Sequence, residues 1–344
     1  MQTVFVGLSG GVDSAVSAYL LKKEGHRVVG AFIKVWEPDF LPCTSGQDRL
    51  DAMRVAAHLG IPFVTYDLAD EYKKGVVDYF VNEYKAGRTP NPDVMCNREI
   101  KFGAFWRMAK ANGADAIATG HYALRKSDIR NRKGVGLFRG VDDSKDQSYF
   151  LWTLTQNDLS HSVFPIGHLK KSEVRAIAKR AGLPNAAKKD SQGLCFLGHV
   201  DMKEFLQHYI PSEKGIVRDV QGNEVGEHDG AWFYTIGQRI GIRGTSRWYV
   251  IEKDIPQNLL VAAQTPLSSR AKTEFALHSV NWIREAPQEE EWYEAEVRYH
   301  GERIPILVRG NSISFKKPIV AASGQSLVVY GPRSNECLGG GIIE

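Results

Sequence analysis

The chain has 344 residues, a hydrophobic fraction of 43% and a formal net charge of +4, which is the composition of a folded protein with two or three domains. Its four cysteines are Cys43, Cys96, Cys195 and Cys337, with no CxxC pair and no Cys/His cluster, so we expect neither structural zinc nor a secreted disulfide framework. The first residues do not resemble a signal peptide, and no apolar run approaches the roughly 20 residues of a membrane span. We therefore expect a cytoplasmic protein.

Strand and helix patterns alternate over the first 120 residues. Helical patterns at 13–25, 47–60 and 100–114 separate β-rich runs at 3–7, 28–33, 61–66 and 115–120. This alternation predicts an α/β domain whose doubly wound, mostly parallel sheet has helices on both faces. Ligands bind such a sheet at the carboxyl ends of its strands.

The pattern changes near residue 165. A helix is predicted at 170–184 and another at 200–210, turns and short strands dominate 214–255, and β-like runs fill the chain after about 258, beginning with LLVAA at 259–263. We therefore expect a small mixed central domain and a C-terminal β-barrel. The predicted boundaries are 1–164 for the α/β domain, to which the loop at 186–200 returns, 165–257 for the central domain and 258–344 for the barrel.

Two segments are strongly basic within this nearly neutral chain. Residues 125–139 hold six Lys or Arg against one acid, and residues 170–189 hold seven against one. Each segment is either a surface that faces a polyanion or an ordinary solvated helix face. The sequence leaves both meanings open.

The stretch GLSGGVDS occupies residues 7–14, between the first predicted strand and the first predicted helix. Its adjacent glycines allow main-chain N–H groups to approach an anion, and its serines and the helix N-terminus add further donors. Asp13 would be repelled by phosphate, so we expect it to hold a Mg²⁺ ion that bridges to phosphate. The spacing is neither Walker A nor G-x-G-x-x-G. We interpret it as a phosphate-binding loop.

SGGVDS resembles the PP-loop of the N-type ATP pyrophosphatases. Those enzymes cleave ATP between its α- and β-phosphates, adenylate a carbonyl or carboxyl oxygen and release pyrophosphate. The resemblance implies that ATP is a substrate. The loop alone does not choose among the synthetases and tRNA thiolases of that superfamily.

Cys96 and Cys195 both follow turn-forming sequence, PNPDVM and KKDSQGL. A lone cysteine is usually buried and inert, and Cys43 and Cys337 keep that interpretation. Cys96 has better grounds, because a helix that begins near Asn97 would place it at the positive helix end, where a thiolate is stabilised. Asp93, three residues earlier, could accept the thiol proton.

The whole chain resembles the bacterial tRNA-specific 2-thiouridylases. The motifs that carry the resemblance are the loop at 7–14, VWE at 35–37, TPNPDVMCNREIKFG at 89–103, ATGHYA at 118–123, KDQSYFL at 145–151, KKDSQGLCF at 188–196, TIGQRIG at 235–241 and the β-rich tail. Thiolases that use an iron–sulfur cluster carry CxxC-type ligands, which are missing here. The resemblance therefore implies a cluster-independent enzyme that thiolates the wobble uridine of tRNA of the Lys, Glu and Gln type.

The resemblance also implies roles for individual residues. Cys195 would carry a persulfide, Cys96 would be the nucleophile, a transient Cys96–Cys195 disulfide would form, and Asp93 would act as acid and base. The implied ATP contacts are Gly7, Leu8, Ser9, Gly10, Gly11, Val12, Asp13, Ser14, Ile33, where the family more often has methionine, and Gly120. Asn91, Pro92 and Asp93 would line the target base. The implied tRNA contacts are His121, Lys145, Asp146, Gln147, Arg298, Tyr299 and Gln325.

The implied partners are the anticodon stem-loop of tRNA and a sulfur-relay protein or cysteine desulfurase, and we expect a monomer. His121 could equally be a satisfied structural histidine. Two other functions stay open. Another PP-loop ATP pyrophosphatase, similar to lysidine synthetase or to the amide-forming synthetases, would not need the two cysteines. An RNA-binding module with a vestigial nucleotide site would not turn over ATP.

Overall fold

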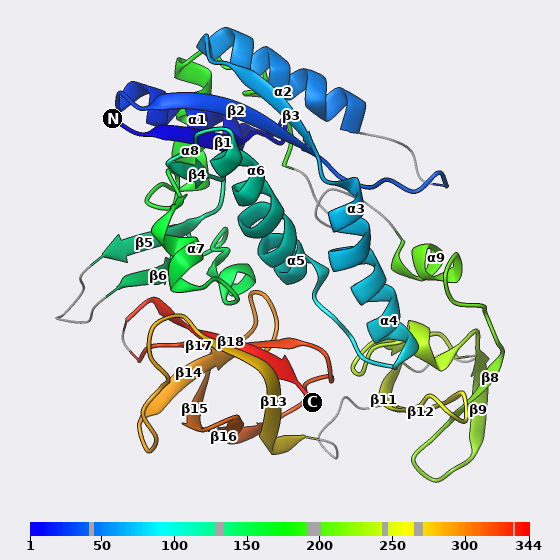
Figure 1. Ribbon diagram of the computed structural model, residues 1–344. Helices are drawn as coiled ribbons and strands as arrows, with labels where there is room; N and C mark the ends of the chain where they lie inside the picture. Colours follow the sequence, from blue (N-terminus) through cyan, green and yellow to red (C-terminus); the bar gives the residue numbers. More distant parts are fainter. Residues whose placement is uncertain (41–44, 128–133, 191–200, 243–246, 265–270, 333) are drawn as a thin grey trace.

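Five parallel strands form the N-terminal sheet, in the order β3-β2-β1-β4-β7 (Figure 1). Their bounds are β1 (Thr3–Gly7), β2 (Arg27–Lys34), β3 (Phe63–Asp67), β4 (Ala116–Ala118) and β7 (Ser162–Val163). The computed structural model describes residues 1–40, 45–127, 134–190, 201–242, 247–264, 271–332 and 334–344. The strand order changes direction at β1, so the carboxyl ends of β1 and β4 frame the crevice where such sheets bind ligands. The predicted doubly wound parallel sheet is confirmed.

Alternate residues of β1 point into two different cores. Val4 and Val6 pack with residues of α1 (Val12–Lys23), α2 (Ser45–Leu59) and α8 (Lys171–Arg180). Phe5 packs on the opposite face with the helical segments between residues 69 and 111. Those segments are α3 (Ala69–Tyr72), η1 (Lys73–Asp78), α4 (Tyr79–Lys85), α5 (Pro92–Met95), η2 (Cys96–Ala104) and α6 (Phe105–Ala111). The period-2 alternation of a strand thus covers both sheet faces with helices.

The middle of the chain forms a curled mixed sheet with strand order β10-β11-β12-β8-β9. Its strands are β8 (Gly215–Arg218), β9 (Glu224–His228), β10 (Arg239–Ile240), β11 (Trp248–Asp254) and β12 (Leu259–Ala263), preceded by α9 (Met202–Gln207) and interrupted by η4 (Ala231–Phe233). The prediction that 259–263 starts the barrel is wrong. β12 pairs with β11 and β8 instead, because an apolar alternating run fits either sheet and tertiary pairing decides.

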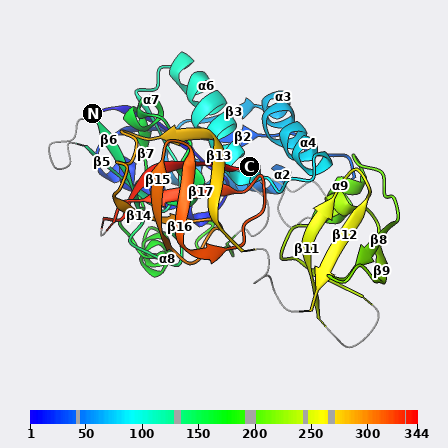
Figure 2. The same cartoon turned by 90° about the horizontal axis from the view of Figure 1, so that it is seen from below.

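Six antiparallel strands close into the C-terminal barrel, which Figure 2 shows beside the middle sheet. They are β13 (Lys272–Trp282), β14 (Trp292–Glu296), β15 (Ile304–Arg309), β16 (Ser312–Ile319), β17 (Ser326–Tyr330) and β18 (Glu336–Ile343), and β13 closes the barrel on β18. A hairpin from the first basic segment, β5 (Ala123–Ser127) and β6 (Val135–Arg139), pairs with β18. The sequence did not predict this hairpin, which joins the α/β domain to the barrel.

Three short elements complete the α/β domain: η3 (Ser148–Leu151), α7 (Gln156–Ser160) and β7. The η3 segment is fixed to the barrel, since the Tyr149 hydroxyl donates to the Ser326 carbonyl at 2.9 Å and Asn281 Nδ2 donates to the Trp152 carbonyl at 2.8 Å. No helix in the described part of the chain combines the length and apolarity needed to cross a bilayer.

Candidate functional site

The phosphate loop follows β1 and leads directly into α1 at the crevice between β1 and β4. Its hydroxyl groups order the turn from within. The Ser9 N–H donates to Ser14 Oγ at 3.2 Å, the Gly11 N–H donates to Ser9 Oγ at 3.3 Å, and Ser14 Oγ donates to the Gly11 carbonyl at 3.2 Å. The loop therefore has a defined shape while its glycine main chain can still approach an anion.

Two glycines of this region cannot be replaced without movement of the backbone. Gly10 has φ +75°, and a Cβ there would lie 2.5 Å from the Asp48 carbonyl oxygen. A Cβ on Gly120 would lie 2.8 Å from the Ser14 nitrogen. The structure thus brings the predicted ATP residue Gly120 against the start of α1. Ile33 is buried in β2, where its main chain pairs with that of Tyr66 in β3.

Asp13 is the charged residue of the loop, and Lys171 neutralises it. The Lys171 ammonium donates to both Asp13 carboxylate oxygens, at 2.7 and 2.8 Å, from the first residue of α8. The Tyr122 hydroxyl donates to Asp13 Oδ1 at 2.8 Å. Burial raises the pKa of Tyr122, and the Asp13 charge raises it further, so this hydroxyl remains a donor. Asp13 is therefore held by two donors from outside the loop.

Asp190 extends the same network toward the segment that contains Cys195. Its carboxylate contacts Lys171 at 2.8 Å and Lys145 at 2.9 Å, and it also pairs with Arg175. Burial opposes ionisation, but hydrogen bonds and charges from Lys171 and Lys145 outweigh it and hold the pKa of Asp190 well below its usual range. Asp190 is thus an anion that links three cations.

The sequence did not single out Lys171, Arg175, Tyr122 or Asp190. The available signals were the motifs at 118–123 and 188–196, which contain Tyr122 and Asp190, and the basic segment 170–189, whose inward members pair with carboxylates of the α/β domain. Besides Lys171 and Arg175, Lys188 contacts Asp48 and Asp51, each at 2.7 Å. The exposed members of the segment are Lys170, Lys179, Arg180 and Lys189. The segment 170–189 is therefore neither a uniformly basic surface for a polyanion nor an entirely solvated helix face.

Asp13 offers the hard oxygen donor that Mg²⁺ prefers. Among the described residues, no group of three or more His, Cys, Asp or Glu side chains converges to hold a metal alone. The donor set fits a Mg²⁺ ion that receives most of its ligands from phosphate and water.

Cys96 lies within a helix and not on a loop, so the prediction that its helix begins near Asn97 is wrong. The helix begins at Pro92, capped by Asn91 Oδ1, which accepts the Val94 N–H at 3.3 Å. A proline fits the first helical position because its missing N–H would have no partner there. The helix then continues without a break through η2, whose first residue is Cys96.

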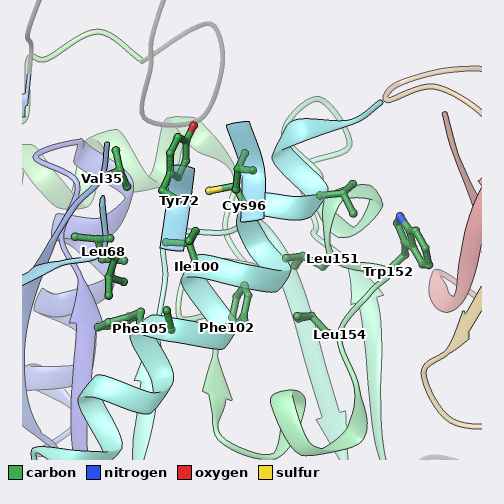
Figure 3. Packing of buried hydrophobic residues seen from close by; sticks show 14 of the residues in the cluster. Val35, Leu68, Tyr72, Cys96, Ile100, Phe102, Phe105, Leu151, Trp152 and Leu154 are labelled. Atoms are coloured by element: carbon green, nitrogen blue, oxygen red, sulfur yellow. The ribbon is translucent and has the colours of Figure 1, made fainter. Parts of the chain in front are cut away.

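Cys96 is 0% exposed and belongs to the core on one face of the sheet. Figure 3 shows its sulfur directed toward Tyr72, with Val35, Leu68 and Ile100 nearby. Val35 and Leu68 follow the carboxyl ends of β2 and β3. The thiol thus lies at the same sheet edge as the phosphate loop, in an apolar environment.

Asn91, Pro92 and Asp93 are partly exposed at the start of this helix. Asp93 precedes Cys96 by three residues, so both lie on one side of the helix. The Asn91 side chain also forms a hydrogen bond with the buried Tyr149 hydroxyl. Cys195 and Cys43 lie outside the described residues, as does most of the loop at 186–200.

Several predicted tRNA contacts have their side chains inside the protein. His121 is 6% exposed, and its Nδ1 lies 2.7 Å from Thr119 Oγ1; burial, reinforced by Lys101, lowers its pKa well below the usual range. Asp146 accepts a hydrogen bond from Arg139 at 2.6 Å, and Gln147 Oε1 accepts the Tyr122 N–H at 3.1 Å. Burial and neutrality favour the structural role that the sequence left open for His121.

The predicted contacts from the barrel are accessible. Arg298 and Tyr299 are exposed between β14 and β15, and Gln325 is half-buried before β17. Tyr299 packs on Phe150, with ring centroids 4.4 Å apart. A polar cavity of about 450 Å³ opens beside it, lined by Arg139, Asp146, Glu294, Glu296, Tyr299, His300, Gly301 and Arg303.

Comparison with known proteins covers the whole described architecture. Three family models match in succession: a tRNA methyl transferase HUP domain over residues 2–199, a tRNA methyl transferase PRC-barrel domain over 203–264, and an aminomethyltransferase β-barrel domain over 272–343. A solved complex of a 4-thiouridine synthetase with RNA and ATP is 21% identical, with a TM-score of 0.36 over 57% of this chain and 45% of that one. That likeness is too low to carry an argument.

The curated relatives are more similar. The tRNA-specific 2-thiouridylase MnmA of Streptococcus thermophilus and that of Idiomarina loihiensis are each 45% identical to this chain, over 99% of it and 95% of theirs. The tRNA-specific 2-thiouridylase MnmA 2 of Geobacillus kaustophilus is also 45% identical, over 99% of this chain and 94% of its own length. The similarity therefore extends across all three structural parts.

Proposed function

The chain belongs to the tRNA-specific 2-thiouridylase family and is a tRNA-uridine 2-sulfurtransferase, and from that premise we propose how its residues divide the reaction. Adenylation takes place at the loop of residues 7–14, and sulfur transfer takes place around Asp93 and Cys96. The observation that carries this division is the position of Asp93 and Cys96 on one side of a helix, at the sheet edge that also holds the phosphate loop.

ATP binds with its phosphates on the main chain of the loop and its nucleoside toward Ile33 and Gly120. The C2 oxygen of the wobble uridine attacks the α-phosphate and pyrophosphate leaves. Adenylation converts this oxygen into a good leaving group, because AMP departs where hydroxide would not. Lys171 and the serine hydroxyls stabilise negative charge on the phosphates.

Mg²⁺ would be held by the phosphates with Asp13 as protein ligand, and it would supply charge neutralisation. Lys171 is the cation that Asp13 pairs with in this structure. We propose that Lys171 then turns from Asp13 to phosphate oxygen.

Sulfur arrives as a persulfide on Cys195, supplied by a sulfur-relay protein or a desulfurase. In one route its terminal sulfur attacks C2 and displaces AMP, and the Cys96 thiolate then attacks the Cys195 sulfur, which breaks the S–S bond and leaves 2-thiouridine. In the other route Cys96 attacks the Cys195 sulfur first, and the released sulfide attacks C2 and displaces AMP. Both routes end in a Cys96–Cys195 disulfide, which an external thiol reduces. Asp93 moves the protons, and Asn91 and Pro92 hold the base, which must leave the anticodon stack. Arg298, Tyr299, Gln325 and the partly exposed Lys145 bind the anticodon stem-loop, and Asp146, Gln147 and His121 support that surface from within. The enzyme acts as a monomer in the cytoplasm.

The test is tRNA-dependent pyrophosphate release, measured together with the 2-thiouridine content at the wobble position. Asp13→Ala is expected to remove pyrophosphate release, and Cys195→Ser is expected to remove thiolation. Unchanged ATP consumption in the first variant, or normal thiolation in the second, would refute the corresponding role.

A further inference from the structure

Thr89 lies two residues before Asn91 and is bonded to two other parts of the molecule. Its N–H donates to the Ser323 carbonyl at 2.8 Å, in the barrel segment between β16 and β17. Its hydroxyl donates to Thr235 Oγ1 at 3.2 Å, in the middle region of the chain. Thr89 itself is 9% exposed. The residue just before the base-binding turn is therefore held from both sides.

The barrel approaches this residue closely at Gly324. Gly324 has φ +88°, and a Cβ there would lie 2.9 Å from both the Arg88 Cβ and the Thr89 nitrogen. Gln325, the next residue, is one of the proposed tRNA contacts. A tRNA that contacts Gln325 would therefore contact the same barrel loop whose Ser323 carbonyl accepts the Thr89 N–H.

The middle region approaches from the other side. The Thr235 hydroxyl also interacts with the Tyr84 hydroxyl at the end of α4 and partly offsets the rise that burial gives to the pKa of Tyr84. Gly87 has φ +74°, and it packs so closely on Ile255 that a side chain there would overlap it. In Figure 1 the segment that joins α4 to α5 passes between the barrel and the middle sheet. Both C-terminal parts therefore meet at residues 84–89.

The turn that follows has little freedom of its own. Pro90 and Pro92 fix their φ angles and restrict the residues before them, and Asn91 is bonded to Val94 and Tyr149. A displacement of Thr89 is therefore passed on to Asp93 and not absorbed by the turn.

We propose that Thr89 is a positioning residue for the reaction: it fixes the Asn91–Pro92–Asp93 turn relative to the barrel and the middle sheet, so that tRNA bound across them presents its uridine to Asp93 and Cys96. The inference rests on the proposed function and adds to it the residue that joins tRNA binding to the base-binding turn. Loss of the Thr89 hydroxyl removes the hydrogen bond to Thr235 in the middle region. The hydrogen bond to Ser323 remains, because the Thr89 main chain donates it.

The test compares Thr89→Val with Thr89→Ser, Thr235→Val and the Thr89→Val/Thr235→Val double variant. Thr153→Val is the matched control, because the Thr153 hydroxyl is buried and has no hydrogen-bond partner among the described residues. Single-turnover thiolation of an anticodon stem-loop gives the rate constant of thiolation, and steady-state, tRNA-dependent pyrophosphate release gives the KM for ATP. Thermal unfolding of each variant is measured alongside.

Thr89→Val is expected to lower the thiolation rate about fivefold, the effect of one neutral hydrogen bond, with the KM for ATP unchanged. Thr89→Ser is expected to restore the rate. Thr235→Val should match Thr89→Val, and the double variant should be no worse than either, because the two hydroxyls act as one unit. A purely structural role would instead lower the unfolding temperature and leave the rate unchanged.

Wild-type rates in Thr89→Val, a double variant whose loss is the product of the single losses, or a proportional rise in the KM for ATP would overturn the proposal. Failure of the proposed function has another signature, because the wild type itself would then form no 2-thiouridine.

Discussion

The phosphate loop and the Cys96 helix lie at the same edge of the N-terminal sheet, yet they are built in opposite ways. The loop is polar and its charge is paired, with Asp13 held by Lys171 and Tyr122. The Cys96 sulfur is fully buried among apolar side chains. Their supporting helices also pack on opposite faces of the sheet.

This contrast indicates that the phosphate loop is already arranged for its reaction, whereas Cys96 is not. The loop already presents the groups that bind phosphate, so ATP requires little rearrangement beyond exchange of the Lys171 partner. Cys96 must become accessible before its sulfur can meet Cys195. We therefore expect adenylation to be preorganised and sulfur transfer to depend on tRNA.

Among the variants that test the phosphate loop against the Cys96 helix, Lys171→Met is expected to slow pyrophosphate release the most. Asp13 and Asp190 would both lose a cation, and the phosphates would lose a charged donor. Tenfold to about 100-fold slower pyrophosphate release is expected, the range for a charge-assisted hydrogen bond. The control is Lys170→Met, which removes the exposed neighbouring charge. Equal loss in both variants would show that overall charge, and not the Asp13 contact, matters.

A smaller effect is expected from Gly120→Ala. The new methyl group would meet the Ser14 nitrogen and the Asp13 main chain at the start of α1. Steady-state pyrophosphate release should show a KM for ATP raised about fivefold, since a shift of the loop weakens several main-chain contacts at once. Gly241→Ala serves as control, because no atom of the described residues lies within 4 Å of a Cβ there. A change in thiolation without a change in the KM for ATP would contradict the assignment of Gly120.

The smallest effect concerns stability at low pH. The pKa of Asp190 is lowered on folding, so its ion pairs contribute fully above the unfolded value of about 3.9 and are lost as the pH falls through the lower folded value. Denaturant unfolding of wild type and Asp190→Asn should therefore differ by a constant amount between about pH 5 and 8. The difference should begin to shrink below about pH 4 and vanish only when the pH falls below the lowered folded pKa of Asp190. A difference that shrinks near neutral pH would contradict the paired state of Asp190.

Sequence patterns predicted the parallel sheet, the phosphate loop and the β-rich tail because each depends on local periodicity or on glycine geometry. They missed the hairpin of β5 and β6 and placed residues 259–263 in the wrong sheet, because strand partners are chosen by tertiary packing. Lys171 stayed hidden among six other cations, since only the fold brings it 2.7 Å from Asp13. The sequence also placed Cys96 on a loop, because Pro-Asn-Pro indicates a turn whether or not a helix starts within it.

The most direct test of the division between the two regions is Cys96→Ser, assayed for pyrophosphate release and for 2-thiouridine on the same anticodon stem-loop. Because the phosphate loop is complete without Cys96, we expect tRNA-dependent pyrophosphate release to continue at a rate within about threefold of wild type, while 2-thiouridine is not formed. Thr153→Val, which changes another buried side chain of similar size, should retain both. Loss of both activities in Cys96→Ser, or thiolation at the wild-type rate, would contradict the account.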